Sequence, residues 1–399
     1  DGSNINDDYA YDANGNLEVD GNKDIIGLVV NTAGQKGIFY NYLNLPEKIQ
    51  MFGKGEIQYK YDASGSKLQK IVYDLASNTT TTYSYIGGAV YKDDVLQFLP
   101  QEEGRIRFIP VQGTQPATFV YDYFIKDHLG NVRMVLTEEV KQDVYPATTF
   151  ENVNYNGGTA VAIEKQYYDI DDTKIVPKES APGITTIYNN NGSPPYNNNP
   201  YSNTTAESQR LYKMNASTNK TGLGIVLKVM SGDVINIFGK SFHKVPTGGN
   251  YTNPVSPLNV LDILNTFITQ PLISPKGITS TQIINQVNFP SSILGLLGNQ
   301  PPQTETTLKA AINWIIFDDN FKYVSGGFDM TGSSAVVKNH NNTSIPDIII
   351  PKNGYIYVYC SNESQYDVFF DNLQVIHSRG PILEETHYYP FGLVQQGIS

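Results

Sequence analysis

The sequence predicts an all-β protein, and its composition is the first reason. The chain has 399 residues, including 28 Tyr and 17 Phe against a single Trp. Tyr and Phe, like Val, Ile and Thr, favour the half-buried surface of a pleated sheet. Short apolar runs are separated by turn formers, with 34 Gly and 22 Pro in the chain, as expected for many short strands. A chain of this length is expected to form two or three domains.

A repeated unit in the first third of the chain is the second reason. The sequence YAYDANGNL at residues 9–17 returns as YKYDASGSKL at residues 59–68. Shorter copies of Tyr-x-Tyr start at Tyr40, Tyr83 and Tyr121. Internal repetition is the signature of repeat architectures, so we expect an array of similar hairpins.

The residue types explain how one unit folds. In the copy at 59–68, Tyr59 and Tyr61 fall on one face of a strand, because strand side chains alternate. Asp62 then accepts hydrogen bonds from backbone N–H groups of a turn, and Gly65 supplies a positive φ. The run from Leu68 returns as the second strand. One unit cannot bury its tyrosine face alone, whereas stacked neighbours can.

Two further motifs indicate a family. Residues 127–133 read DHLGNVR and contain Asp127, Gly130 and Arg133. Residues 387–392 read HYYPFG and contain Tyr388, Tyr389, Pro390, Phe391 and Gly392. In this order, with the Tyr-x-Tyr-Asp units, they resemble the YD repeats and core motifs of RHS-repeat proteins of the Bacteroidetes type. The resemblance covers about 1–137 and 378–399 and implies a segment of a β-hairpin spiral.

Between these flanks, residues 138–377 are expected to form an inserted β-sandwich. Residues 224–237 read as two strands around a Ser-Gly-Asp turn, and residues 310–317 as a central strand with two apolar faces. Two short helices are expected, one capped by Ser256 with apolar residues from Leu261 onward, and one beginning at Ser280.

The two ends of the insert are similar to those of jelly-roll carbohydrate-binding modules. Residues 149–151 resemble the first strand of such modules, and residues 368–375 resemble the last. The resemblance implies a structural Ca²⁺ held by Glu151 and Asp371 with backbone carbonyls. Calcium takes six to eight oxygen ligands, so two carboxylates are only part of a site. The alternative is that both are solvated carboxylates at strand ends.

Glycan binding by the insert needs exposed rings beside amide and carboxylate groups. Five residues near expected loops have these properties: Tyr196, Tyr201, Phe242, His243 and Tyr251. Trp314 lies among apolar strand residues and is expected in the core.

Several classes of function are disfavoured. The net charge is −11 with no basic cluster, so nucleic acid is not an expected partner. No apolar run reaches the roughly 18 residues of a membrane span, and no membrane insertion is expected. Cys360 is the only cysteine and is expected to be buried. The five histidines are scattered, and no nucleophile, metal-ligand or nucleotide motif is present, so we expect no enzyme.

The RHS resemblance implies a non-enzymatic part of a large secreted protein at or beyond the cell surface, of which this chain is expected to be a piece. Its partners would be the remainder of its own β-spiral shell, an enclosed C-terminal cargo or toxin domain, and an outer-membrane secretion or surface complex, with type IX export. The alternative is a cell-surface adhesin or motility-associated protein whose jelly-roll insert binds glycan. A more remote alternative is a fragment of a glycoside hydrolase.

Overall fold

A computed structural model shows two compact units, and it confirms the all-β class. Unit 1 comprises Asp1–Glu139 and Leu383–Ser399, and unit 2 comprises Val140–Ile382. In the part of the chain that the structure describes, antiparallel strands predominate and the α-helices are α1 (Ala160–Glu164), α2 (Val260–Ile268) and α4 (Phe289–Gly298). The described residues are 8–27, 36–111, 116–152, 154–155, 158–181, 183–184, 210–246, 257–269, 289–303 and 308–398.

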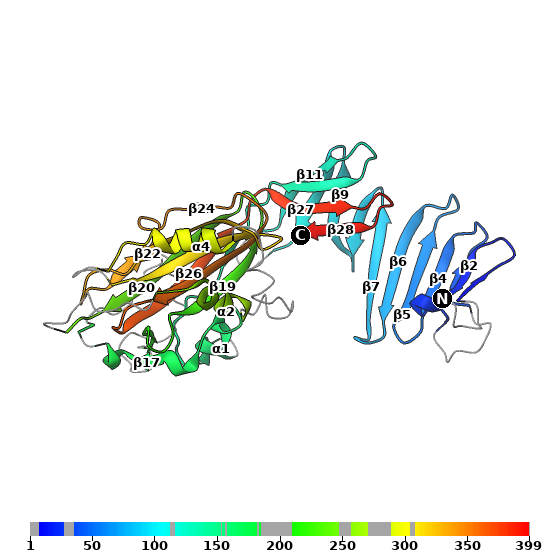
Figure 1. Ribbon diagram of the computed structural model, residues 1–399. Helices are drawn as coiled ribbons and strands as arrows, with labels where there is room; N and C mark the ends of the chain where they lie inside the picture. Colours follow the sequence, from blue (N-terminus) through cyan, green and yellow to red (C-terminus); the bar gives the residue numbers. More distant parts are fainter. Residues whose placement is uncertain are drawn as a thin grey trace. The chain divides into compact units, whose positions relative to one another are not determined.

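Unit 1 is built on a 12-stranded antiparallel sheet (Figure 1). In sheet order its strands are β3 (Ile38–Tyr40), β4 (Pro46–Met51), β5 (Gly55–Tyr61), β6 (Lys67–Asp74), β7 (Thr79–Ile86), β8 (Ala89–Lys92), β9 (Val95–Gln101), β10 (Gly104–Ile109), β11 (Thr118–Lys126), β12 (Val132–Thr137), β27 (Ile382–Tyr388) and β28 (Val394–Ile398). A separate hairpin, β1 (Tyr9–Tyr11) and β2 (Leu17–Asp20), precedes it. Neighbours in the sheet are neighbours in the chain, except that β12 lies beside β27.

Unit 2 therefore interrupts a connection between two adjacent strands. The chain leaves the sheet after β12, forms unit 2, and returns as β27 hydrogen-bonded to the strand it left. In Figure 1 the red strands β27 and β28 accordingly extend the cyan strands of unit 1. The sequence placed the borders of the insert at 137/138 and 377/378, and the structure divides the chain at 139/140 and 382/383.

The hairpin turns of unit 1 share one geometry. In the turn at 62–66, the Asp62 N–H donates to the Ser66 carbonyl (2.9 Å) and the Gly65 N–H donates to the Asp62 carbonyl (3.1 Å). Gly65 has φ of +89°, and the strand register shifts between Lys60 and Tyr61, which is typical of a three-residue loop with a G1 bulge. The same pair of backbone bonds occurs in the turns at 12–16, 41–45, 127–131 and 389–393.

The four of these turns that belong to the 12-stranded sheet lie on one rim of it. Successive connections of an antiparallel meander alternate between its two ends. The turns β3–β4, β5–β6, β11–β12 and β27–β28 are each separated by an even number of connections along the sheet. The connection from β12 to β27, which contains unit 2, is therefore on the opposite rim.

Unit 1 has little core of its own. The three clusters of buried hydrophobic side chains found among the described residues all lie in unit 2. Most side chains of β4 to β7 are half-buried on both faces, as in a single-layer sheet. Stability must then come from the strand ladder, cross-strand pairs and turns rather than from a packed interior.

Unit 2 is a sandwich of two antiparallel sheets. One sheet has the order β17 (Ile175–Pro177), β18 (Arg210–Met214), β26 (Val368–Ser378), β20 (Val234–His243) and β23 (Lys338–His340), with β13 (Gln142–Val144) paired to β26 and β24 (Ile348–Ile349) paired to β20. The other has the order β16 (Tyr168–Asp169), β19 (Thr221–Val229), β25 (Gly354–Asn362), β21 (Ala310–Asp318) and β22 (Tyr323–Met330). A small hairpin, β14 (Asn154–Tyr155) and β15 (Gly158–Thr159), precedes α1.

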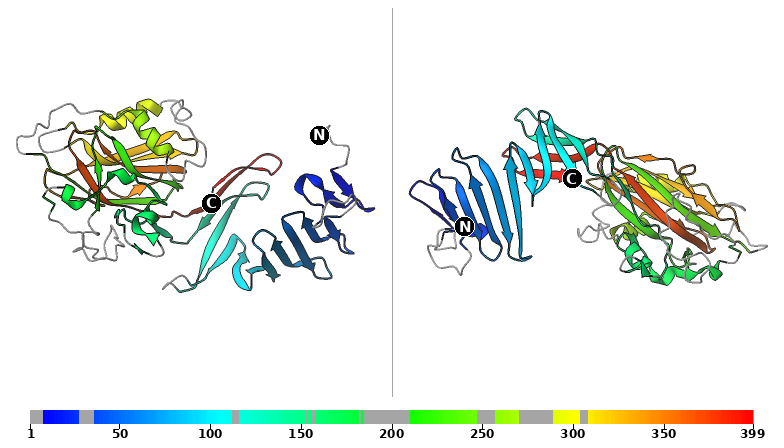
Figure 2. Two further views of the ribbon diagram at one scale, coloured as in Figure 1. Left: turned by 90° about the horizontal axis from the view of Figure 1, so that it is seen from below. Right: turned by 180° about the vertical axis from the view of Figure 1, so that it is seen from behind.

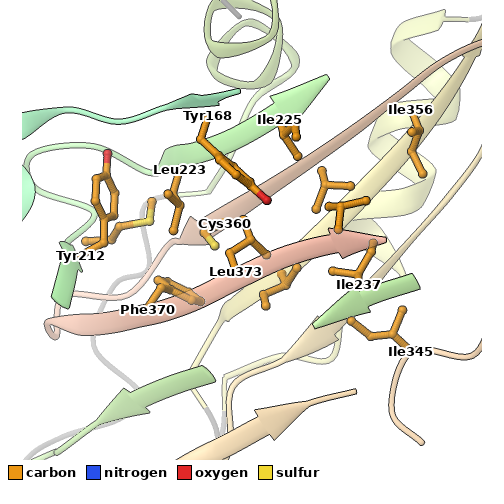
Figure 3. Packing of buried hydrophobic residues seen from close by; sticks show 14 of the residues in the cluster. Tyr168, Tyr212, Leu223, Ile225, Ile237, Ile345, Ile356, Cys360, Phe370 and Leu373 are labelled. Carbon is orange, nitrogen blue, oxygen red and sulfur yellow. The ribbon is translucent and has the colours of Figure 1, made fainter. Parts of the chain in front are cut away.

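The main core lies between these sheets (Figure 3). Ile237 and Phe370 enter it from the first sheet, and Ile225 and Ile356 enter it from the second. Cys360 is fully buried there, as the sequence indicated, and burial raises the pKa of its thiol. The strand 310–317 is confirmed as a central strand, because β21 lies between β25 and β22 and both its faces are buried.

Both outer faces of the sandwich are covered. Helices α2 and α4, which lie together along one side in Figure 2, pack Phe267 and Leu296 against Phe317 and Tyr357 of the second sheet. On the first sheet, Ala181 packs with Leu211, Phe242 and Phe369.

The expected start of the first helix is wrong. Residues 257–259 are not helical, and α2 begins at Val260. The physical reason is a capping box: the Asn259 side chain accepts the Asp262 N–H (2.9 Å), and the Asp262 carboxylate accepts the Asn259 N–H (3.1 Å). Ser256 and the helix expected from Ser280 lie outside the described residues. Helix α4 was not foreseen.

Unit 2 is expected to fold after excision as residues 140–382. Its entering strand β13 pairs with the end of β26, with Gln142 opposite Ser378, so both ends meet at one antiparallel pair and the core is internal. We expect a single cooperative thermal transition, measured by near-UV circular dichroism. A shorter piece, 145–374, lacks this pairing and should melt at a lower temperature; equal melting of the two, or no transition in the longer one, would contradict the assignment.

The turn at 62–66 can be tested by substitution of Asp62. Asp62→Ala removes the acceptor of the Ser64 and Ser66 N–H groups (both 2.9 Å), so amide exchange at both residues should accelerate. Asp62→Asn is the matched control and should retain protection, because Asn41 accepts the equivalent bonds in the 41–45 turn.

Alanine substitutions at two turn glycines with positive φ provide a second test, in which the expected loss of stability differs between the two sites. Gly65→Ala and Gly130→Ala should each destabilise the local hairpin by roughly 1–2 kcal/mol, the cost of a left-handed L-residue. The loss should be larger at Gly65, where a new Cβ would lie 3.2 Å from Leu45 Cδ1, than at Gly130, where no atom lies within 4 Å. Equal exchange in the wild type and both variants would contradict this account.

Candidate functional site

The two motifs of unit 1 that are farthest apart in sequence contact each other. Arg133 lies on β12 and donates from Nη2 to Nδ1 of His387 on β27 (3.1 Å). Its guanidinium carbon also lies 5.6 Å from the ring centre of Tyr388, and the Tyr388 hydroxyl donates to the Val132 carbonyl (3.2 Å). The DHLGNVR and HYYPFG motifs thus form the seam where the sheet resumes after the insert.

The seam also sets the tautomer of His387. An arginine donates and cannot accept, so Nδ1 of His387 must be the acceptor. The proton is then on Nε2, which donates to Glu385 Oε1 (3.0 Å). The chain of contacts from Arg133 to Glu385 orders side chains on both strands.

The remaining motif residues build turns. Asp127 Oδ1 accepts the N–H groups of Leu129 and Asn131 (both 2.9 Å), and the hydrogen bond from the Asn131 side chain lowers the pKa of Asp127. Gly130 has φ of +85°. In the last motif Tyr389 takes the place of the aspartate, followed by Pro390, the fully exposed Phe391 and Gly392 with φ of +80°.

A charge network around a buried aspartate joins β10, β11 and the segment after β12, and it was not found from the sequence. Asp122 is fully buried and accepts Nε of Arg105 (2.8 Å) and Nε of Arg107 (2.6 Å), and Arg107 also binds Glu139 (2.8 Å). Burial acts to raise the pKa of Asp122, but the hydrogen bonds from Arg107 and Arg105 outweigh it and hold this pKa below its usual value. The Arg-x-Arg spacing at 105–107 was the available signal.

Two neighbouring repeat copies enclose a shallow cavity of about 690 Å³ lined by residues of 40–47 and 59–63. Tyr40, Tyr42, Tyr59 and Tyr61 are among the lining residues. Rings beside polar groups are the surface chemistry that suits a sugar.

The structure brings the expected calcium ligands near each other. Glu151 is buried, and its Oε1 accepts the Arg210 N–H (3.1 Å). Asp371 on β26 accepts the backbone N–H (2.8 Å) and side-chain amide (2.7 Å) of Asn372. Burial first, and then the negative charge of Glu151, raises the pKa of Asp371. A third carboxylate, Glu164, accepts the N–H groups of Thr149 and Phe150.

The fit to calcium is partial. Carboxylate oxygens are the correct ligand type, and a cation would relieve the repulsion between Glu151 and Asp371. However, in the described part of the chain no group of three or more acidic, histidine or cysteine side chains is placed to hold a metal ion. Further ligands would have to be backbone carbonyls or water. Calcium at this pair therefore stays a prediction.

Two glycan candidates need correction. Phe242 is 3% exposed and His243 is 0% exposed, so neither can stack on or hydrogen-bond a sugar at the surface. Both lie near the end of β20, where the sequence had suggested a nearby loop. Phe242 packs with Ala181, Leu211 and Phe369 on the outer face of the first sheet, and His243 lies opposite Val368, which belongs to the main core. Tyr196, Tyr201 and Tyr251 lie outside the described residues. Trp314 packs against the main core, partly buried.

The sequence also did not predict a Ser–His–Asp arrangement in unit 2. Ser241 Oγ donates to Nε2 of His340 (2.8 Å), and Nδ1 of His340 donates to Asp329 Oδ2 (2.6 Å). The connectivity matches a nucleophile, base and orienting carboxylate. Ser241 and His340 are each only 1% exposed, so a substrate has no path to the hydroxyl in this conformation. The relay instead connects the edges of the two sheets, since Asp329 is on β22 and His340 on β23.

No protein-family model matches the sequence, and no curated protein is significantly similar to it. The likeness to RHS-repeat proteins therefore depends on the sequence motifs alone. Among the described residues, no helix combines the length and apolar character needed to span a bilayer.

The seam predicts a specific effect of Arg133. Arg133→Ala removes the contacts with His387 and Tyr388 and should weaken the β12–β27 ladder by about 1 kcal/mol. Faster amide exchange in 383–388 is the expected result. Lys126→Ala removes the same charge from an exposed site on the adjacent strand β11 and should leave this exchange unchanged. Equal effects of the two variants would mean that only net charge matters.

Proposed function

We propose that this chain is a non-enzymatic segment of a secreted RHS-type β-shell that displays a folded sandwich from one rim of its sheet. The observation that carries the proposal is the pairing of β12 with β27. Because these strands are neighbours, the sheet continues past unit 2, and unit 2 takes the place of a hairpin loop. A scaffold that presents a module has this organisation.

Three features of unit 1 support a scaffold role. The turns repeat one geometry, so strands can be added without a change of design. The sheet is a single layer with half-buried rings, which suits a wall more than a compact domain. β28 ends the sheet order, and the remainder of the shell would continue from that strand.

The location and partners follow from the RHS likeness. We infer a secreted or cell-surface protein that reaches the outer membrane through a secretion or surface complex, by the type IX route. The shell would enclose a C-terminal cargo or toxin domain. The net charge of −11 favours neither nucleic acid nor an anionic membrane as partner.

The test is a deletion in the full-length protein. Residues 140–382 are replaced by Asn-Gly, which joins Glu139 to Leu383 as a two-residue hairpin. The shell should still assemble, as seen by negative-stain electron microscopy, while protease treatment of whole cells should no longer release unit 2 fragments. The matched control replaces 382–388 with a Gly/Ser linker and should prevent assembly. Loss of the shell in the deletion, or assembly in the control, would refute the scaffold role.

Glycan binding distinguishes the adhesin alternative from the scaffold role. A glycan array probed separately with unit 2 and with the intact chain should show no binding if the chain is only a scaffold. Binding by unit 2 would favour the adhesin, and binding by the intact chain alone would point to the tyrosine-lined cavity of unit 1. Release of reducing sugar from a bound polysaccharide would favour the glycosidase alternative.

A further inference from the structure

Unit 2 contains three histidines that are fully or almost fully buried on its first sheet. They are His243 on β20, His340 on β23 and His377 on β26, each at most 1% exposed. His340 and His377 each lie 2.6 Å from a carboxylate, Asp329 and Asp233 respectively. A carboxylate partner lets a buried imidazole accept a proton without leaving an isolated charge.

His243 is different. Neither of its ring nitrogens has a hydrogen-bond partner among the described residues. A buried, unpaired imidazolium is strongly unfavourable, so this ring is stable in the closed structure only when neutral. An unsatisfied polar group in a native interior requires an explanation, such as strain, a functional role, or a bound water or ion.

The backbone around His243 holds a loop in place. The His243 carbonyl accepts the Ala335 N–H (2.7 Å), and two residues later the Val245 N–H donates to Ser334 Oγ (3.0 Å). The loop at 331–337 connects β22 of one sheet to β23 of the other. These two bonds therefore fix the connection that closes one edge of the sandwich.

The groups around this edge are also polar. Ser241, two residues before His243 and on the same face of β20, donates to His340, which donates to Asp329. Lys338 Nζ donates to Asp329 Oδ1 (2.5 Å). Across the ladder, His243 lies opposite the apolar Val368 of β26, and the next residue, Lys244, is exposed. A proton on His243 would therefore meet an apolar neighbour on β26 and two cations, Lys338 and Lys244, in the adjoining segments.

We propose that the end of β20 and the loop at 331–337 form an acid-sensitive clasp, in which protonation of His243 releases the loop and opens the edge of the sandwich between β22 and β23. The partner is the proton itself, so the clasp would report a change from a neutral to an acidic environment. Opening exposes Ser241, His340 and the inner faces of two edge strands.

The direction follows from burial. Burial lowers the pKa of His243 from 6.5 to about 4 in the closed state, whereas an exposed ring in the open state regains an ordinary value near 6.5. The open state then binds more protons between these values, so the clasp is stable above pH 6.5 and weakens as the pH falls toward 4. One proton per opening corresponds to about a tenfold rise in the open population for each pH unit.

The neighbouring pair does not reverse this direction. Burial acts to raise the pKa of Asp329, but its hydrogen bonds with His340 and Lys338 outweigh burial and hold this pKa at about 2. The contribution of the ionised Asp329 to the stability of the closed state is therefore lost only below pH 3.8. Burial also lowers the pKa of His340, and its protonation would add to acid opening. A variant at His243 separates the two histidines.

The test is hydrogen exchange of the intact chain, read at the amides of Ala335 and Val245 and corrected for intrinsic rates. Between pH 6.5 and pH 5 the protection of both should fall about fifteenfold in the wild type, because one proton binds per opening and half of the open rings are already protonated at pH 6.5. His243→Phe, which cannot titrate, should abolish this fall, and Lys244→Ala, an exposed neighbour, should retain it. If the Phe variant does not fold, His243→Gln serves as the non-titrating variant.

Three outcomes would overturn the proposal. One is flat protection of the wild-type amides across this pH range. Another is an equal fall in the His243 variant, which would assign the effect to His340. The last is the same fall at β19 and β25 amides in the centre of the second sheet, which would mean global unfolding rather than opening of one edge.

Discussion

The first side chain of each YD-type turn determines whether unit 1 can exist as a single layer. Asp12, Asp62 and Asp127 each accept two backbone N–H groups of their own turn, and Asn41 does the same in its turn. A glycine or asparagine then takes a positive φ and directs the chain back. Because no large core holds these strands together, each hairpin must be formed locally, and the turn chemistry supplies that local preference.

The insertion point obeys the same constraint. An insertion disturbs a sheet of consecutive hairpins least where the chain already leaves the strand ladder, which is at a turn. Unit 2 replaces such a turn, on the rim opposite the turns that share one geometry. After the insert, the contact between Arg133 on β12 and Tyr388 on β27 helps to align these two strands. Unit 2 in turn has its own core between two sheets.

Features carried by local sequence could be predicted, and those assembled from distant strands could not. The turns at 62–66 and 127–131 follow from Asp and Gly at fixed spacing, and the central strand at 310–317 follows from its two apolar faces. The Ser241–His340–Asp329 relay joins two consecutive strands, β22 and β23, to Ser241 on β20, which is far from both in the chain, so no single segment signals it. Phe242 and His243 were expected near a loop, whereas the ladder of β20 with β26 extends through both residues and both are buried.

The pairing of Gln142 with Ser378 has a consequence for how such proteins diversify. Residues opposite each other in an antiparallel pair lie about 5 Å apart, so unit 2 presents its host with two ends separated by the width of one hairpin. Any domain whose ends meet at that spacing would satisfy the same rim connection without shifting the register of β12 against β27. Recombination at this point would exchange whole modules while the wall that carries them keeps its strand pairing unchanged.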